Sequence, residues 1–193
     1  MTLLALLRHA PTDWNRERRL QGRRDLALTP AAQADYAIRR IPDRCPRFRV
    51  LASPLARARQ TAALLGLAAT VEPRLIEMDW GRYEGSTIAA LREDPGFALN
   101  EARGLDFQPP DGESPRAVQA RLEPLLAEIA ASHEPTLCVT HRGVIRAIYA
   151  LARGWPMVGR PPDKLASDAL QIFALDEAGH PSVAQLNVAL VPR

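Results

Sequence analysis

Cysteine, lysine and long apolar runs are scarce in this chain of 193 residues. Its two cysteines, Cys45 and Cys138, form neither a CxxC pair nor part of a Cys/His cluster, which argues against a zinc site and against a disulfide framework. No apolar run approaches the length that crosses a bilayer, and the run at 3–7 is too short for the apolar core of a signal peptide. We therefore expect a cytoplasmic protein with no membrane partner.

Lys164 is the only lysine among 25 basic residues, and the formal net charge is +3. Aromatic residues make up 5% of the chain, and neither an aromatic-rich RNA-binding pattern nor a helix-turn-helix pattern is present, so we expect no nucleic-acid partner. An arginine-rich chain of this kind suits a phosphorylated small molecule instead. The arginines at 16–24 are either a solvated face or a means of attracting an anionic substrate.

Apolar runs and helical patterns alternate along the chain. Continuous apolar runs, typical of buried parallel strands, occupy 3–7, 48–53 and 136–141. Two further runs, at 169–175 and 183–191, flank the turn residues "DEAGHP" and predict a hairpin at the sheet edge.

Three of the four expected helices begin with a hydroxyl residue followed by proline, the pattern of an N-cap and a first helical position. These pairs start at Thr29, Ser53 and Ser114, and the helices are expected over 30–41, 54–66, 114–131 and 143–153. Pro124 should kink the third helix or mark its true start. Alternating strands and helices predict an α/β fold, a three-layer α/β/α sandwich with a mostly parallel central sheet.

We expect one domain over 1–193, with the irregular segment 77–113 as a cap or lid of short helices over one edge of the sheet.

Three predicted strands end in polar residues. The first runs into Arg8 and His9, the second into Ser53 with Arg57 one turn further, and the third into His141. Ligands of open α/β sheets bind outside the carboxyl ends of the strands, so these side chains should share one crevice. A neutral histidine can attack phosphorus, and arginines bind and stabilise the phosphoryl oxygens. Departure of an alkoxide also requires a general acid, most simply a carboxylate.

Four motifs in this order carry a resemblance to a known family. They are "LLRHAPTDWNRERRLQGRRDLALT", "SPLARARQTA", "LIEMDWGRYEG" and "VTHRGVIRAI", and the loop "PDGESP" also fits. Over about 3–148 the chain resembles the histidine phosphatase superfamily, in its phosphoglycerate mutase-like branch. The resemblance implies a phosphoglycerate mutase-like fold. It also implies the hydrolysis of phosphomonoesters of small metabolites through a phosphohistidine.

The resemblance also implies a role for each matching residue. His9 would be the nucleophile, and Glu77 would protonate the leaving group and then activate water. Arg8, Arg57 and His141 would hold the phosphoryl group; the remaining substrate-binding residues would be Asn15, Gln21, Gly22 and Arg142. No metal or cofactor is expected, because the arginines supply the positive charge.

Two residues depart from the family pattern, since Ala10 and Arg142 stand where glycine is usual. Ala10 is tolerable unless the position needs a positive φ, and Arg142 either adds a cation to the pocket or points away. Asp79 is a rival to Glu77 as the acid. A phosphoglycerate mutase and a catalytically silent phospho-ligand-binding protein are the alternative functions. The acid motif is also similar to that of α-ribazole phosphatases.

Overall fold

A six-stranded sheet forms the centre of the computed structural model, which describes residues 1–193. The strand order is β4-β3-β5-β1-β6-β7; the first four strands are parallel, and β6 and β7 form an antiparallel hairpin at one edge. The bounds are β1 Thr2–Arg8, β3 Arg49–Ala52, β4 Thr70–Val71, β5 Thr136–Thr140, β6 Ala169–Leu175 and β7 Pro181–Ala189. A separate two-stranded ribbon pairs β2 (Arg39–Arg40) with β8 (Val191–Pro192).

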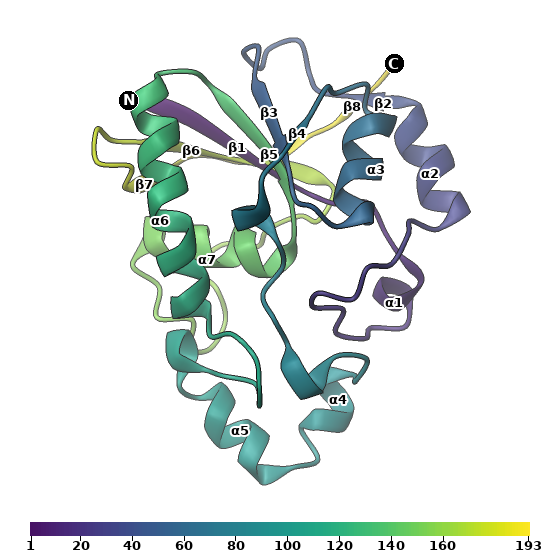
Figure 1. The fold of residues 1–193 in the computed structure, drawn as a ribbon, viewed down its shortest axis with the longest axis vertical. Helices are drawn as coiled ribbons and strands as arrows, with labels where there is room; N and C mark the ends of the chain where they lie inside the picture. Colours follow the sequence, from purple (N-terminus) through teal and green to yellow (C-terminus); the bar gives the residue numbers. More distant parts are fainter.

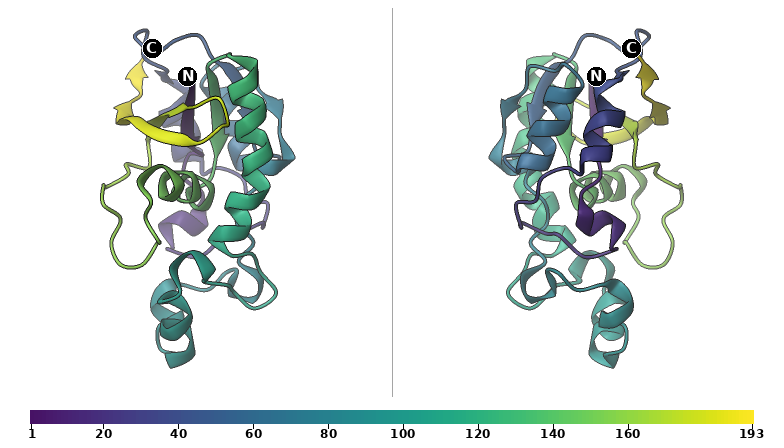
Figure 2. Two further views of the ribbon diagram at one scale, coloured as in Figure 1. Left: turned by 90° about the vertical axis from the view of Figure 1, so that its left-hand side faces the viewer. Right: turned by 90° about the vertical axis from the view of Figure 1, so that its right-hand side faces the viewer.

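Helices cover both faces of the sheet (Figures 1 and 2). Alternate side chains of β1 point to opposite faces: Leu4 and Leu6 belong to one apolar cluster, and Ala5 and Leu7 to another. The first cluster is shared with α6 and α7, the second with α2 and α3, so the predicted three-layer sandwich with a mostly parallel sheet is confirmed. These helices span α2 Pro30–Ala37, α3 Ala56–Leu64, α6 Pro115–Ser132 and α7 Arg142–Arg153.

Two of the three predicted helix caps are confirmed. The hydroxyl of Thr29 accepts from the amide of Ala32, and that of Ser114 accepts from the amide of Ala117. In α6, Pro124 lies inside a continuous helix that already begins at Pro115, so it does not mark the helix start.

The prediction of a cap at Ser53 is wrong. Helix α3 begins at Ala56, and its N-cap residue, Leu55, makes no side-chain capping bond. The Ser53 hydroxyl instead lies 2.6 Å from Nε2 of His141, and the carboxylate of Asp25 accepts from the amide of Ala56 at 2.7 Å. The helix is therefore capped by a residue from a distant loop, Asp25. The hydroxyl of Ser53 contacts His141, which follows the neighbouring strand β5.

Segment 77–113 contains four short helices, which lie beyond the carboxyl ends of the parallel strands rather than over an edge strand (Figure 1). The rings of Phe97 and Phe107 meet edge-on at 5.7 Å and join the apolar cluster of α6 and α7. The segment is thus packed onto the same core as the sheet. The helices are η2 Gly81–Tyr83, α4 Ile88–Leu91, α5 Pro95–Glu101 and η3 Gly104–Asp106; α1 (Asp13–Arg16) and η1 (Pro73–Leu75) complete the fold.

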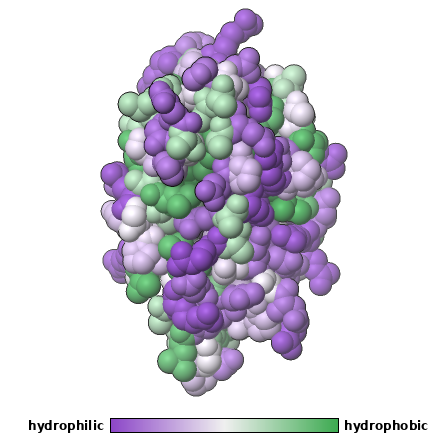
Figure 3. All heavy atoms as spheres, turned by 60° about the vertical axis from the view of Figure 1, so that its left-hand side comes forward, coloured by the Kyte–Doolittle hydropathy of each residue, from purple (hydrophilic) through white to green (hydrophobic).

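Hydrophilic side chains dominate the face seen in Figure 3, where apolar side chains form small separate groups. The exposed large apolar residues are scattered over the chain, at Met1, Ile38, Val71, Leu99, Leu151 and Val158. None of the helices is both long and apolar enough to traverse a bilayer.

Candidate active site

His9 directly follows β1, in the middle of the sheet. Its amide donates to the carbonyl of Thr140 at 2.9 Å, and the residue is 4% exposed. Nδ1 of the ring lies 2.7 Å from the carbonyl oxygen of Ala10. Because a carbonyl oxygen can only accept, Nδ1 carries the proton and Nε2 retains its lone pair. The contact therefore holds the neutral tautomer with a nucleophilic Nε2.

His141 lies beside His9, with the two ring centroids 5.2 Å apart. Its Nδ1 accepts from Nε of Arg57 at 3.3 Å, so Nε2 carries the proton and donates to the Ser53 hydroxyl. Burial lowers the pKa of both histidines well below the usual range. Arg57 and Arg8 lower the pKa of His9 further, so both rings are neutral near pH 7.

Arg57 is completely buried on α3, and its guanidinium makes no ion pair with a carboxylate. Two of its nitrogens donate to the carbonyls of Gly22 and Arg24, each at 2.7 Å. These contacts fix the guanidinium without neutralising it, so the charge is available to an anion beside His9. Gly22 makes this contact with a φ of +51°.

Arg8 is the second uncompensated cation. One of its terminal nitrogens donates to the hydroxyl of Ser167 at 3.1 Å, whereas Nε is buried without any partner. An unpartnered buried donor is costly, and a phosphoryl oxygen would satisfy it. Burial and the nearby Arg142 lower the pKa of Arg8, which records two like charges close to one another.

The side chain of Glu77, a residue between η1 and η2, reaches the N-terminus of α7, and the residue is 8% exposed. Its carboxylate accepts from the amide of Met78 at 2.8 Å and from the amide of Gly143 at 3.2 Å. Burial raises the pKa of Glu77, although both amides, Arg57 and Arg8 oppose the shift. A carboxyl group with a raised pKa keeps its proton to a higher pH than an ordinary glutamate does, which favours the role of a general acid.

Gly143 makes room for this carboxyl group. A Cβ atom at position 143 would lie 2.4 Å from Oε1 of Glu77. The rival acid, Asp79, points elsewhere: one of its oxygens accepts from the amide of Gly81 and the other pairs with Arg23 at 3.3 Å. Gly143 is not among the residues that the sequence predicts for the site. The only feature of the sequence that could have indicated it is its position two residues after His141.

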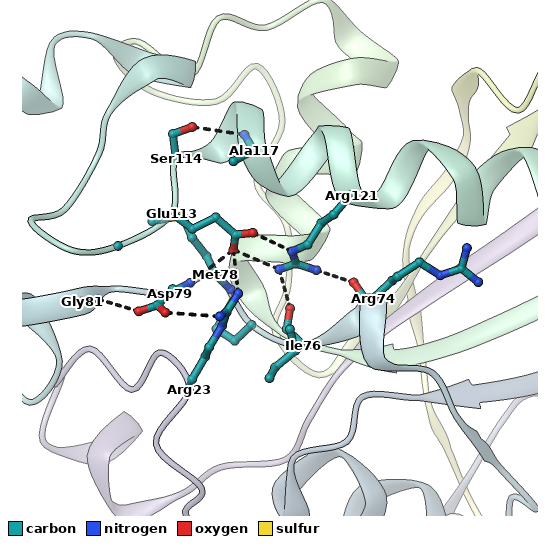
Figure 4. A network of polar contacts seen from close by, with 12 residues as sticks. Arg23, Arg74, Ile76, Met78, Asp79, Gly81, Glu113, Ser114, Ala117 and Arg121 are labelled. Atoms are coloured by element: carbon teal, nitrogen blue, oxygen red, sulfur yellow. Dashed lines mark hydrogen bonds and ion pairs between the residues drawn. The ribbon is translucent and has the colours of Figure 1, made fainter.

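The chain on both sides of Glu77 is held by a polar network, drawn in Figure 4. Arg121 of α6 donates to the carbonyls of Arg74 and Ile76 and forms a bidentate pair with Glu113. Arg121 is not among the residues predicted for the site, and Glu113 carries a signal only as part of the loop motif "PDGESP". Charged residues are common on helix surfaces and in loops, so neither carried a distinguishing signal.

The remaining residues predicted to bind substrate make contacts of their own. Oδ1 of Asn15 accepts from the amide of Thr12 at 3.0 Å and caps α1, and Gln21 bonds to the hydroxyl of Thr12 at 2.9 Å. Arg142 occupies the first turn of α7 and is exposed, without an acidic partner within ion-pair distance. Ala10 is buried and has no positive φ, so its methyl group is accommodated.

A cavity of about 520 Å³ opens beside His9, between the residues after β1, helix α2 and the loop before β6. Cationic, acidic and hydroxyl groups line it together, among them Arg8, Asn15, Arg16, Tyr36, Ser167 and Asp168. Burial raises the pKa of Tyr36 to about 12, so its hydroxyl stays protonated. The cavity can accept a polar organic group attached to a phosphoryl group.

Comparison with known proteins gives a consistent result. The sequence profile of the family described as "Histidine phosphatase superfamily (branch 1)" matches residues 4–188. Glucosyl-3-phosphoglycerate phosphatase of Mycobacterium tuberculosis is 34% identical over 178 residues, covering 81% of this chain and 79% of the relative. A probable phosphoglycerate mutase of Enterobacter sp. is 31% identical over 167 residues, covering 81% and 77%.

Solved structures agree with this result. The mycobacterial glucosyl-3-phosphoglycerate phosphatase in complex with VO3 superimposes with a TM-score of 0.78 at 27% identity, over 98% of this chain and 100% of that one. A phosphoglycerate mutase of Thermus thermophilus gives a TM-score of 0.73 at 32% identity, with the same coverage.

Proposed function

Because the chain belongs to branch 1 of the histidine phosphatase superfamily, we propose that it hydrolyses phosphomonoesters of small metabolites through a phosphohistidine on His9. In the first step Nε2 of His9 attacks phosphorus, the ester P–O bond breaks, and the departing oxygen takes the proton of the Glu77 carboxyl group. In the second step the Glu77 carboxylate removes a proton from water, whose oxygen attacks phosphorus. The P–N bond then breaks, and phosphate leaves with Nε2 restored.

One observation carries the proposal: Nδ1 of His9 donates a hydrogen bond to the carbonyl of Ala10, which leaves the Nε2 lone pair free. The ring lies beside two cations, the partly buried Arg8 and the fully buried Arg57, which have no carboxylate bound to them. Fixed charges of this kind stabilise the oxygens of a phosphoryl group in transfer. We therefore propose that catalysis is metal-independent.

The substrate we propose is a small phosphorylated metabolite of the phosphoglycerate type. Its support is that the mycobacterial and Enterobacter relatives both carry phosphoglycerates in their names. We assign the exposed, unpaired Arg142 to an anionic group of the substrate beyond the phosphate. Asn15 has its oxygen engaged in the cap of α1, so its amide nitrogen remains for a phosphoryl oxygen. We also assign Gln21 and Gly22 to substrate binding, since the carbonyl of Gly22 holds Arg57 and Gln21 contacts Thr12.

A phosphoglycerate mutase is the second candidate, supported by the names of the Enterobacter and Thermus relatives. A mutase would return the phosphoryl group from His9 to a second substrate hydroxyl rather than to water. The two functions are distinguished by their products, free phosphate or an isomeric phosphoglycerate.

The test is hydrolysis of p-nitrophenyl phosphate in the presence of EDTA, with His9→Ala, Glu77→Gln and, as a control, His133→Ala. His133 is the exposed C-cap residue of α6, and its amide donates to the carbonyl of Ala130. We expect turnover by the wild type and by His133→Ala, and none by His9→Ala. Wild-type interconversion of 2- and 3-phosphoglycerate without release of phosphate would favour the mutase. The absence of both reactions would contradict the proposal.

We also propose a cytoplasmic location, supported by the free thiols of Cys45 and Cys138.

A further inference from the structure

Four side chains, Arg23, Asp79, Glu113 and Arg121, connect three separate parts of the chain around Glu77 (Figure 4). Arg121 comes from α6, Arg23 from the loop after α1, and Asp79 and Glu113 from the two ends of segment 77–113. None of them touches His9, and hydrolysis as proposed assigns them no role. We call this group the clasp.

The clasp holds the backbone on both sides of Glu77. On the preceding side, Arg121 donates to the carbonyl of Ile76 at 2.6 Å. On the following side, a Glu113 oxygen accepts from the amide of Asp79 at 3.3 Å, and the amide of Glu113 donates to the carbonyl of Asp79 at 2.9 Å. Arg121 and Glu113 are themselves paired at 2.8 Å, with side chains 19% and 14% exposed. The position of the Glu77 backbone therefore depends on this partly buried ion pair.

Arg23 connects the clasp to the phosphoryl-binding side of the site. Its guanidinium lies 3.3 Å from the carboxylate of Asp79 and 3.5 Å from that of Glu113. The residues next to it, Gly22 and Arg24, provide the carbonyls that hold Arg57. One short loop thus contacts both the arginine that binds the phosphoryl group and the segment that carries the acid.

We propose that Arg23, Glu113 and Arg121 are positioning residues that set the place of the Glu77 carboxyl group relative to the phosphoryl site. The inference rests on the proposed function, because it takes Glu77 as the general acid. A displacement of about 1 Å of a catalytic group can cost about 10²-fold in rate, so loss of the clasp should act through proton donation. It should spare the attack of His9, which the clasp does not contact.

Leaving groups separate these two effects. p-Nitrophenolate departs as a stable anion and needs no proton, whereas the alkoxide of glycerol 3-phosphate must be protonated as it leaves. The ratio of kcat/KM for the two substrates therefore reports on the acid alone, because kcat/KM includes only the steps up to departure of the leaving group. A merely structural role would lower both values together.

The variants are Glu113→Gln, Arg23→Gln and Arg23→Lys, with Glu77→Gln as the reference and Asp111→Asn as the matched control. Asp111 lies two residues before Glu113, and its only ion pair, with Arg82, is exposed. Glu113→Gln should lower kcat/KM for glycerol 3-phosphate at least about tenfold and that for p-nitrophenyl phosphate less than about threefold. Arg23→Gln should act in the same direction, and Arg23→Lys should recover most of the loss. Asp111→Asn should leave both values within about threefold of the wild type.

If Glu113→Gln lost kcat/KM equally on both substrates, or kept full activity on both, the proposed positioning role of the clasp would be wrong. Failure of Glu77→Gln to show any dependence on the leaving group would instead overturn the acid role of Glu77, and with it that part of the proposed function. If Glu113→Gln does not fold, the pair Arg23→Gln and Arg23→Lys decides the question, since this side chain is more exposed at 40%.

Discussion

Replacement of Gly143 by alanine should separate catalysis from stability. A Cβ atom there would lie 2.4 Å from Oε1 of Glu77, and ordinary contact begins near 3.4 Å, so the carboxyl group must move by about 1 Å. The obstructed atom is the end of a flexible side chain. Gly143 has no positive φ and lies in the first turn of α7, where alanine is acceptable. The variant should therefore fold with a free energy of unfolding within about 1 kcal/mol of the wild type.

The chemical cost should fall on substrates that need an acid. We expect Gly143→Ala to lower kcat/KM for glycerol 3-phosphate by about 10²-fold, with little change for p-nitrophenyl phosphate. Gly154→Ala is the matched control, because this residue ends the same helix with a φ of +60°, and a Cβ atom there would have no neighbour within 4 Å. It should lose about 1 kcal/mol of stability and keep wild-type kinetics. Wild-type activity of Gly143→Ala on glycerol 3-phosphate would refute this account of Glu77.

Two further substitutions and one change of pH test other contacts of the site. Arg57→Gln should lower kcat/KM by about 10²–10³-fold on both substrates alike, because the charge serves the phosphoryl group and not the leaving group; a loss on one substrate only would contradict this. Because His9 and His141 have depressed pKa values in the folded state, their contribution to stability is present above about pH 6.5. It should be lost as the pH falls below that value, by up to about 1.4 kcal/mol per pH unit for each ring, as urea unfolding at several pH values would measure; a flat profile from pH 7 to 5 would argue against buried neutral rings. Gly22→Ala should cost about 2 kcal/mol and weaken phosphate inhibition, since the residue has a φ of +51° and its Cβ would lie 1.9 Å from the Glu84 carboxylate; unchanged thermal stability would contradict the tight contact.

The sequence predicted the parts of the site that local pattern and sheet topology determine. Arg8, His9 and His141 directly follow apolar runs, and parallel strands bring their carboxyl ends together, so their proximity could be inferred. The layer order, the edge hairpin and two helix caps follow from similarly local signals. Glu77 could be predicted only from the family motif, because it does not follow a predicted strand.

The rest depends on contacts between distant segments. Ser53 was predicted to cap α3, but its hydroxyl bonds to His141, 88 positions away, and Asp25 provides a capping acceptor instead. The Ser53 hydroxyl could bond either to the start of α3 or to His141, and the tertiary structure selects His141. No local sequence pattern predicts that choice. The same holds for Arg121 and Glu113, whose partners are backbone groups near Glu77 and whose residue types are typical of any surface.

The phosphorylated intermediate itself provides the most direct test of the central claim. Glu77→Gln slows the attack of water, so a short incubation of this variant with p-nitrophenyl phosphate, followed by an alkaline quench, should preserve any phosphohistidine. Peptide mapping by mass spectrometry should then find one phosphoryl group, on His9 through Nε2. A phosphoryl group on another residue, or an unmodified His9 in a variant that still releases p-nitrophenol in a burst, would contradict nucleophilic catalysis by His9.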